Sequence, residues 1–152
     1  MTSTKTLVVD TETTGFTDND YHRLHKTAYM IQLGLVVMDD STGEITDSYF
    51  TWTIPRDIEG NIKTVPETTF FMRAGLTNTK VHELGIEYPV AMKQLRQRCK
   101  GVSRIVAHNM DFDQQILTAV DLRSGADTPW HCGLPLFYTM TKHTQHLSLI
   151  HI

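Results

Sequence analysis

Two acidic residues at the end of an apolar run constrain this chain more than any other feature. Leu7, Val8 and Val9 are strand-forming residues, and Asp10 and Glu12 follow them with one residue in between. Because side chains alternate along a strand, the two carboxylates are expected on the same face. Partly buried neighbouring carboxylates repel each other unless a cation lies between them. Oxygen ligands suit a hard divalent ion, so the pair predicts a Mg²⁺ or Mn²⁺ site.

The residues that follow, Thr13, Thr14 and Gly15, predict a tight exit from the strand. Glycine allows the backbone to approach a ligand closely at such a point. A strand that ends in an ordinary polar turn is the alternative interpretation of the same pattern.

Length and composition place the chain among globular proteins. Its 152 residues are enough for one domain with its own core, over residues 1–152. The net charge of −3 supplies no overall positive field for nucleic acid, so bound cations would have to provide one locally. Cys99 and Cys132 have no zinc-type spacing, and we expect reduced thiols and a cytoplasmic location. No segment approaches the roughly 18 apolar residues of a membrane span, so no membrane partner is expected.

The pattern of apolar residues predicts strands alternating with helices later in the chain. The turn residues at 39–43 indicate an antiparallel hairpin between the second and third strands, with Trp52 in the core. Short helical pieces interrupted at Gly75 are expected over 66–84. After residue 127 the pattern weakens, and only the segment 134–140 is expected to be ordered. The strands are expected over 6–10, 30–38, 45–54 and 103–107, and the two longer helices from Pro89 to Gly101 and from 110 to Gly125.

A second stretch with chemical content runs from Val106 to Asp113. A strand, a polar turn and a helix follow one another here, a junction that places functional groups at the edge of a sheet. Asp113 falls in the first turn of the helix, where the helix dipole favours a carboxylate. From these residues alone, a structural acid at a helix N-terminus is the simpler interpretation.

Together the two stretches resemble a known family. Asp10-Thr11-Glu12-Thr13-Thr14-Gly15 resembles the first motif of the DnaQ-like (DEDDh) 3′–5′ exonucleases of the RNase H-like superfamily. Ala107-His108-Asn109, followed by Phe112-Asp113, resembles the second motif, and the resemblance covers roughly residues 5–140. It implies an α/β fold with an RNase H-like mixed sheet, in which three antiparallel strands are followed by parallel ones, with helices on its faces.

The resemblance also implies a two-metal hydrolase of the proofreading or repair type, which uses two Mg²⁺ or Mn²⁺ ions. Asp10 would bridge both ions, Glu12 would bind one, and Asp113 would help to hold a metal, with Asp111 as its rival. The substrate would be single-stranded or 3′-terminal nucleic acid, DNA rather than RNA, and a DNA polymerase is an implied partner. The products would be nucleoside 5′-monophosphates. The residues implied to contact the terminal nucleotide are Thr13, Thr14, Gly15, Asn109 and Phe112.

The family's third motif, a His followed five residues later by an Asp, is missing. Only His108 and Asp113 have this spacing, and they belong to the second motif. We therefore expect a weak or inactive nuclease, a fragment that is incomplete at the C-terminus and lacks the family's last helices, with one apolar face uncovered. The alternatives are a non-catalytic member of the fold that binds nucleic acid or a polymerase, an RNase H-like endonuclease, and a plain interaction domain.

Overall fold

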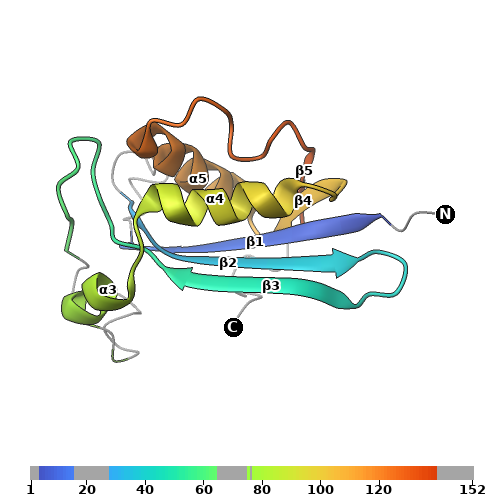
Figure 1. Ribbon diagram of the computed structural model, residues 1–152, viewed down its shortest axis with the longest axis horizontal. Coiled ribbons are helices and arrows are strands. Elements are labelled where there is room, and N and C mark those ends of the chain that lie inside the picture. Colours follow the sequence, from blue (N-terminus) through green and yellow to red (C-terminus); the bar gives the residue numbers. More distant parts are fainter. Residues whose placement is uncertain (1–3, 16–27, 65–74, 76, 140–152) are drawn as a thin grey trace.

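A five-stranded sheet and three helices make up the computed structural model, which describes residues 4–15, 28–64, 75 and 77–139 (Figure 1). The expected helical pieces before residue 75 lie outside the described residues. No described helix is long and apolar enough to cross a membrane. The elements are β1 (Lys5–Thr13), β2 (Met30–Asp39), β3 (Ile45–Trp52), α3 (Asn78–Leu84), α4 (Tyr88–Cys99), β4 (Arg104–Ala107), α5 (Met110–Ser124) and β5 (Leu136–Tyr138).

The sheet is mixed, as the sequence predicts. Its strand order is β3-β2-β1-β4-β5. β1 pairs antiparallel with β2, and β2 pairs antiparallel with β3, whereas β4 is parallel to β1 and β5 is parallel to β4. The apolar run of β1 therefore lies at the centre of the sheet, because its residues have a partner strand on each side.

Helices α4 and α5 cover one face of this sheet (Figure 1). Their buried positions recur at helical spacing, and Pro89 stands at the start of α4, where its missing N–H costs nothing. Leu7 and Val9 of β1 alternate onto the same face and join them. The main core contains Leu7, Val9, Leu33, Leu35, Tyr88, Met92, Leu95, Ile105, Met110, Ile116, Leu117, Val120 and Trp130.

The opposite face carries Val8, Val36 and Val106, which are half-buried register partners across three strands. Phe137 continues this row on β5 as the register partner of Val106, whereas Ser48 is the β3 partner of Val36. Phe50 pairs with Gly34 and therefore lies in the same row as Asp10. Phe50 and Phe137 are 41% and 48% exposed. Within the described part of the chain, α4 and α5 both lie on the other side of the sheet.

Trp130 is the feature that the sequence patterns missed. It lies between α5 and β5, where Pro129 and Gly133 interrupt every periodic signal, yet its side chain is only 1% exposed. Its indole N–H donates to the hydroxyl of Thr118 at 3.3 Å. One buried aromatic residue thus holds the loop between α5 and β5 against the core.

Replacing Trp130 with alanine is therefore expected to lower the free energy of unfolding by about 3–5 kcal/mol, because a large cavity opens in the core. Guanidinium denaturation followed by linear extrapolation measures the change. Leu122→Ala is the matched control, since Leu122 is exposed on α5, and it should change stability by less than about 0.5 kcal/mol. Equal losses in the two variants would contradict the role given to Trp130.

Candidate metal-binding carboxylate site

Asp10 and Glu12 lie on the same face of β1, as the alternation of the strand predicts. Their register partners on β2 are Gly34 and Gln32, and the register stays regular until after Glu12. Thr11, between them, points to the helix-covered side and is buried. Because glycine has no side chain, Gly34 itself places no side-chain atoms beside the Asp10 carboxylate.

Asp113 reaches this strand from the first turn of α5. Its Oδ1 accepts hydrogen bonds from the backbone N–H and the hydroxyl of Thr11, at 2.9 and 2.8 Å, although the two residues are 102 positions apart in the sequence. The side chain is only 3% exposed. Asp113 is therefore not a solvated acid at a helix N-terminus, because its carboxylate joins α5 to the central strand.

The rival Asp111 lies elsewhere. It is exposed on α5 and accepts a hydrogen bond from the hydroxyl of Tyr138 on β5. Asp113 is therefore the acid of the second motif that contacts β1 between Asp10 and Glu12.

Burial and the charge of neighbouring carboxylates raise the pKa values of Asp10 and Asp113. Burial, followed by the charge of Glu12, raises the pKa of Asp10 to about 7. Burial also raises the pKa of Asp113 to about 7; the hydrogen bond from the Thr11 hydroxyl opposes this shift and the charge of Asp10 adds to it. Among the described residues, no lysine or arginine forms an ion pair with Asp10 or Asp113. The site has an excess of negative charge that a cation would relieve.

The donor set fits a hard divalent cation in its chemistry, because every candidate ligand is a carboxylate oxygen. In the described part of the chain, however, no group of three His, Cys, Asp or Glu side chains is close enough to form a ready-made metal cage. Asp10 and Glu12 could hold an ion as a pair, with water completing its shell, as Mg²⁺ commonly allows. Asp113 would then act from beside Asp10, through its contact with Thr11.

The exit from β1 is a tight turn, as expected. Gly15 has a φ of 93°, which favours glycine, and its N–H donates to the hydroxyl oxygen of Thr13 at 3.2 Å. The hydroxyl oxygen of Thr14 accepts from the N–H of Tyr29 at 3.1 Å. Both threonine hydroxyls are thus oriented by backbone groups, and a hydroxyl that accepts one bond can still donate another to a ligand.

Asn109 and Phe112 shape the start of α5. The backbone carbonyl of Asn109 accepts from the N–H groups of Phe112 and Asp113, at 3.0 and 3.3 Å, while its side chain makes no capping bond. The Phe112 side chain is partly buried and packs against the main core. These contacts fix the first turn of the helix, and with it the position of Asp113.

His108 is a polar residue of this region to which sequence reasoning assigned no role. It directly follows β4, and its Nδ1 lies 3.4 Å from the hydroxyl of Thr139. Its Nε2 is buried and has no hydrogen-bond partner among the described residues. Only its place inside the second motif could have drawn attention to it.

Comparison with known proteins identifies the fold. No family model and no curated protein matches the chain. Among solved structures, exonuclease I of E. coli in complex with a dT13 oligonucleotide matches with a TM-score of 0.65 and 14% identity, over 87% of this chain and 27% of that one. Apo exonuclease I gives a TM-score of 0.66 and 15% identity, over 88% of this chain and 29% of that one.

A complex named ExoI/SSB-Ct matches with a TM-score of 0.66 and 14% identity, over 88% of this chain and 28% of that one. This chain therefore spans only a little more than a quarter of the length of these structures. The likeness confirms the DnaQ-like exonuclease fold that the two motifs predict.

The raised pKa values make a prediction for stability against pH. In the folded state Asp10 and Asp113 bind protons up to about pH 7, whereas in the unfolded chain they lose them near the ordinary aspartate pKa of 3.8. Without metal, the free energy of unfolding should fall by on the order of 5 kcal/mol from pH 5 to pH 8, because both carboxyls release their protons at a higher pH in the folded state than in the unfolded chain. Denaturation at a series of pH values measures this slope. Asp57, whose pKa is lowered to about 2, titrates outside this window.

Asp113→Asn should flatten this slope, since the amide oxygen can still accept from Thr11 but no longer titrates. Asp127→Asn, which changes an exposed acid in the loop after α5, is the control and should leave the slope as it is. A slope unchanged in both Asp10→Asn and Asp113→Asn would contradict the assignment of the raised pKa values.

The contact between Thr11 and Asp113 is expected to show energetic coupling. Thr11→Val removes the hydroxyl donor and keeps the shape of the side chain, so the buried carboxylate loses a charge-assisted hydrogen bond. In a double-mutant cycle with Asp113→Asn, we expect a coupling energy of about 1–2 kcal/mol from denaturant unfolding. A cycle between Thr11 and Asp111, built in the same way, should give a value near zero, and comparable values in the two cycles would speak against the contact.

Proposed function

We propose that this chain is a metal-dependent 3′–5′ exonuclease domain, which releases nucleoside 5′-monophosphates from the 3′ end of single-stranded DNA. The observation that carries the proposal is the position of Asp113. Asp113 lies 102 positions after Thr11 in the sequence, yet its carboxylate accepts two hydrogen bonds from Thr11. Thr11 is the residue between Asp10 and Glu12, whose carboxylates share a face of β1. In a fold like that of exonuclease I, this convergence favours phosphodiester hydrolysis over a purely structural role.

Asp10 and Glu12 would hold Mg²⁺ or Mn²⁺, with two ions in the complete site. When bound, the ions would supply positive charge at the scissile phosphate and activate the attacking water. Asp113, fixed by Thr11, would add a third carboxylate beside Asp10 and so strengthen the attraction of this edge of the sheet for a divalent cation. The raised pKa of Asp10 means that protons compete with metal near pH 7.

The turn after β1 would position the terminal nucleotide. Thr13 and Thr14 have hydroxyls oriented by backbone groups, and Gly15 allows the ligand to approach the backbone closely. Asn109 and Phe112 lie at the start of α5, on the chain segment that carries Asp113, and would contact the last sugar or base.

Single-stranded DNA is the proposed substrate because E. coli exonuclease I, which has this fold, was solved with a dT13 oligonucleotide. The overall charge of −3 gives the chain little attraction for nucleic acid without metal. Binding of DNA is therefore proposed to depend on the same ions as hydrolysis. A DNA polymerase as a partner rests on the sequence resemblance alone.

A nucleic-acid-binding domain without catalysis is the second candidate. It is favoured by the sequence, in which only His108 and Asp113 have the spacing of the family's third motif. A missing positioned general base costs on the order of 10²- to 10⁴-fold in rate. We therefore propose slow hydrolysis for this chain.

Metal binding gives the first test. Titration calorimetry with Mn²⁺ at about pH 7.5 should show binding to the wild type that weakens at least tenfold in Asp10→Asn. Asp111→Asn is the control, because Asp111 is on the same helix turn as Asp113 but bonds to Tyr138. Mn²⁺ affinity that is the same in all three proteins would remove the basis of the proposal.

Cleavage of a labelled single-stranded oligonucleotide gives the second test. We expect Mg²⁺-dependent release of mononucleotides from the 3′ end, at least about 10²-fold slower than by E. coli exonuclease I. A 3′-phosphate should block the reaction, and Asp10→Asn should abolish it. Metal and DNA binding with no mononucleotide release would favour the second candidate, and internal cuts in a 3′-blocked substrate would favour an endonuclease.

A further inference from the structure

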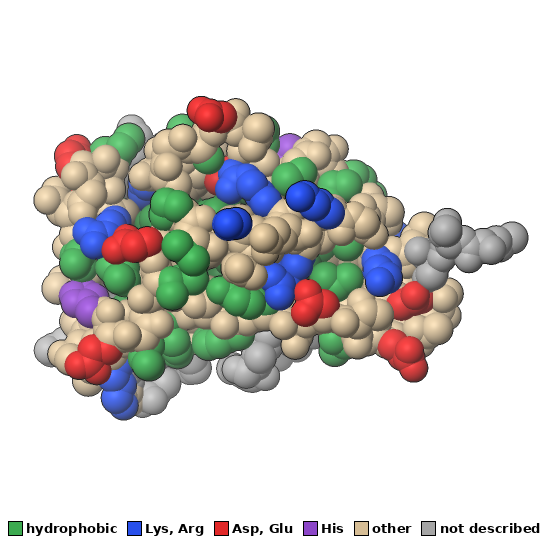
Figure 2. Space-filling model, viewed as in Figure 1, with side chains coloured by type: hydrophobic (Ala, Val, Ile, Leu, Met, Phe, Trp, Pro, Cys, Tyr) green, Lys and Arg blue, Asp and Glu red, His purple; other side chains and the backbone are tan. Residues whose placement is uncertain are grey.

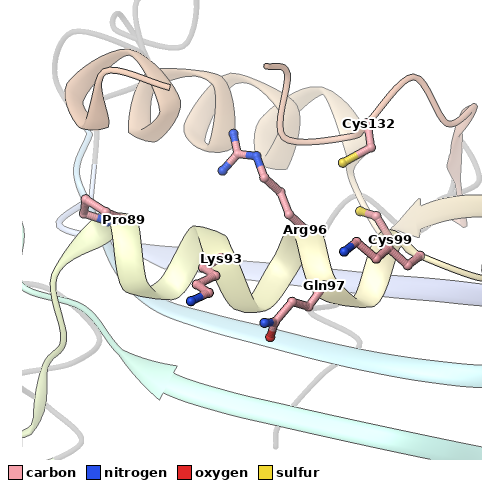
Figure 3. A pocket seen from close by; sticks show the side chains of 7 residues that line it. Pro89, Lys93, Arg96, Gln97, Cys99 and Cys132 are labelled. Atoms are coloured by element: carbon pink, nitrogen blue, oxygen red, sulfur yellow. The ribbon is translucent and has the colours of Figure 1, made fainter. Parts of the chain in front are cut away.

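The two cysteines of the chain meet at one place, although 33 positions separate them in the sequence. Cys99 ends α4, and Cys132 lies in the loop between α5 and β5. The Sγ atoms of both lie 3.7 Å from the same carbonyl oxygen, that of Trp130. Figure 3 shows the two sulfur atoms turned toward each other. Both are free thiols in this structure.

The conformation of the loop between α5 and β5 brings the two thiols together. Trp130 is buried in the core, and the N–H of Cys132 donates to the carbonyl of Pro129 at 3.1 Å, so the chain turns back over the end of α4. Cys132 has a φ of 52°, which is uncommon for a residue with a side chain. The core contact of Trp130 therefore fixes a backbone conformation that holds Cys132 above Cys99.

The two thiols differ in their access to solvent. Cys132 is exposed, whereas Cys99 is buried. Burial, followed by the neighbouring Cys132, raises the pKa of Cys99 to about 12. Cys132 is thus the sulfur that a reagent from solution meets first, and Cys99 stays protonated beneath it.

Both sulfur atoms line a cavity of about 580 Å³ with a positively charged wall. Lys93, Arg96 and Lys100 of α4 contribute to this wall, and no acidic residue lines it. Arg96 pairs with Asp121 at 2.5 Å, while the two lysines form no ion pair with any described residue. Figure 2 shows lysine and arginine side chains gathered over α4 on this side of the molecule. Such a cavity favours an anionic reagent.

We propose that Cys99 and Cys132 form a dithiol site, which a small anionic disulfide bound in this cavity oxidises to an intramolecular disulfide. The Cys132 thiolate attacks one sulfur of the reagent, the reagent's S–S bond breaks, and one thiolate leaves. Cys99 then attacks the Cys132 sulfur, gives up its proton, and expels the second thiolate of the reagent. The protein loses two hydrogen atoms, and the reagent is reduced to two thiols. An excess of a small thiol reverses both steps.

The crosslink would join α4 to the loop that leads into β5. β5 pairs with β4, and the N–H of Thr139 donates to the carbonyl of Ala107 at 3.0 Å, close to the start of α5. Oxidation would thus stabilise the loop and this part of the sheet without any contact with Asp10 or Glu12. The inference is independent of the proposed nuclease activity.

Oxidised glutathione, an anionic disulfide, is the probe for the test, applied to the full chain. Intact mass analysis without reductant should show the loss of two hydrogen atoms, and peptide mapping should find Cys99 linked to Cys132. Closing this segment should raise Tm by roughly 5–10 °C, and dithiothreitol should reverse the change. A stable mixed disulfide on Cys132 of the wild type, with Cys99 still free, would overturn the proposal.

Two sets of variants sharpen the test. Cys99→Ser should stop the reaction at the mixed disulfide on Cys132, whereas Cys132→Ser should leave Cys99 unmodified. Lys93→Gln with Lys100→Gln should slow the reaction with oxidised glutathione severalfold but leave the reaction with a neutral disulfide, bis(2-hydroxyethyl) disulfide, unchanged. Equal slowing with both reagents would contradict the role of the cationic wall, and the mass and mapping data on the wild type decide the dithiol even if a variant fails to fold.

Discussion

The two hydrogen bonds between Thr11 and Asp113 are the contact on which the candidate site depends. One carboxylate oxygen accepts from both the backbone N–H and the hydroxyl of Thr11, and so ties the start of α5 to the central strand. The same contact brings a third negative charge close to Asp10, whose pKa burial and Glu12 already raise. Folding thus assembles like charges that destabilise one another, and protons or a cation must compensate them. Such a local conflict is typical of sites kept for function.

The rest of the fold serves to hold this edge of the sheet. Packing of α4 and α5 on one face leaves Asp10 and Glu12 on the other, beside the apolar row of Val8, Val36 and Val106. Trp130 completes the packed side and also positions the loop that carries Cys132. The dithiol and the carboxylates are therefore separate chemical sites supported by one core.

Local patterns were sufficient to predict much of this arrangement. The alternation of β1 predicts the shared face of Asp10 and Glu12, and the hairpin and the helix ending at Gly125 follow from turn residues and apolar spacing. The choice of Asp113 over Asp111 needed the family motif, because a contact across 102 residues leaves no local signal. Trp130 and the cysteine pair could not be predicted either, because proline and glycine residues interrupt the apolar periodicity around Trp130 and Cys132. The two motifs imply three carboxylates around one metal, but among the described residues no three acidic, histidine or cysteine side chains lie close enough together to hold an ion.

Anomalous diffraction from crystals soaked in Mn²⁺ tests the central claim, that the three carboxylates serve a shared divalent cation. We expect a Mn²⁺ peak within about 2.2 Å of oxygens of Asp10 and Glu12, with Asp113 bound to the same ion or to its waters. The peak should vanish in Asp10→Asn crystals grown in the same form. A protein that takes up Mn²⁺ at another place, and leaves these carboxylates without a peak at saturating metal, would contradict it.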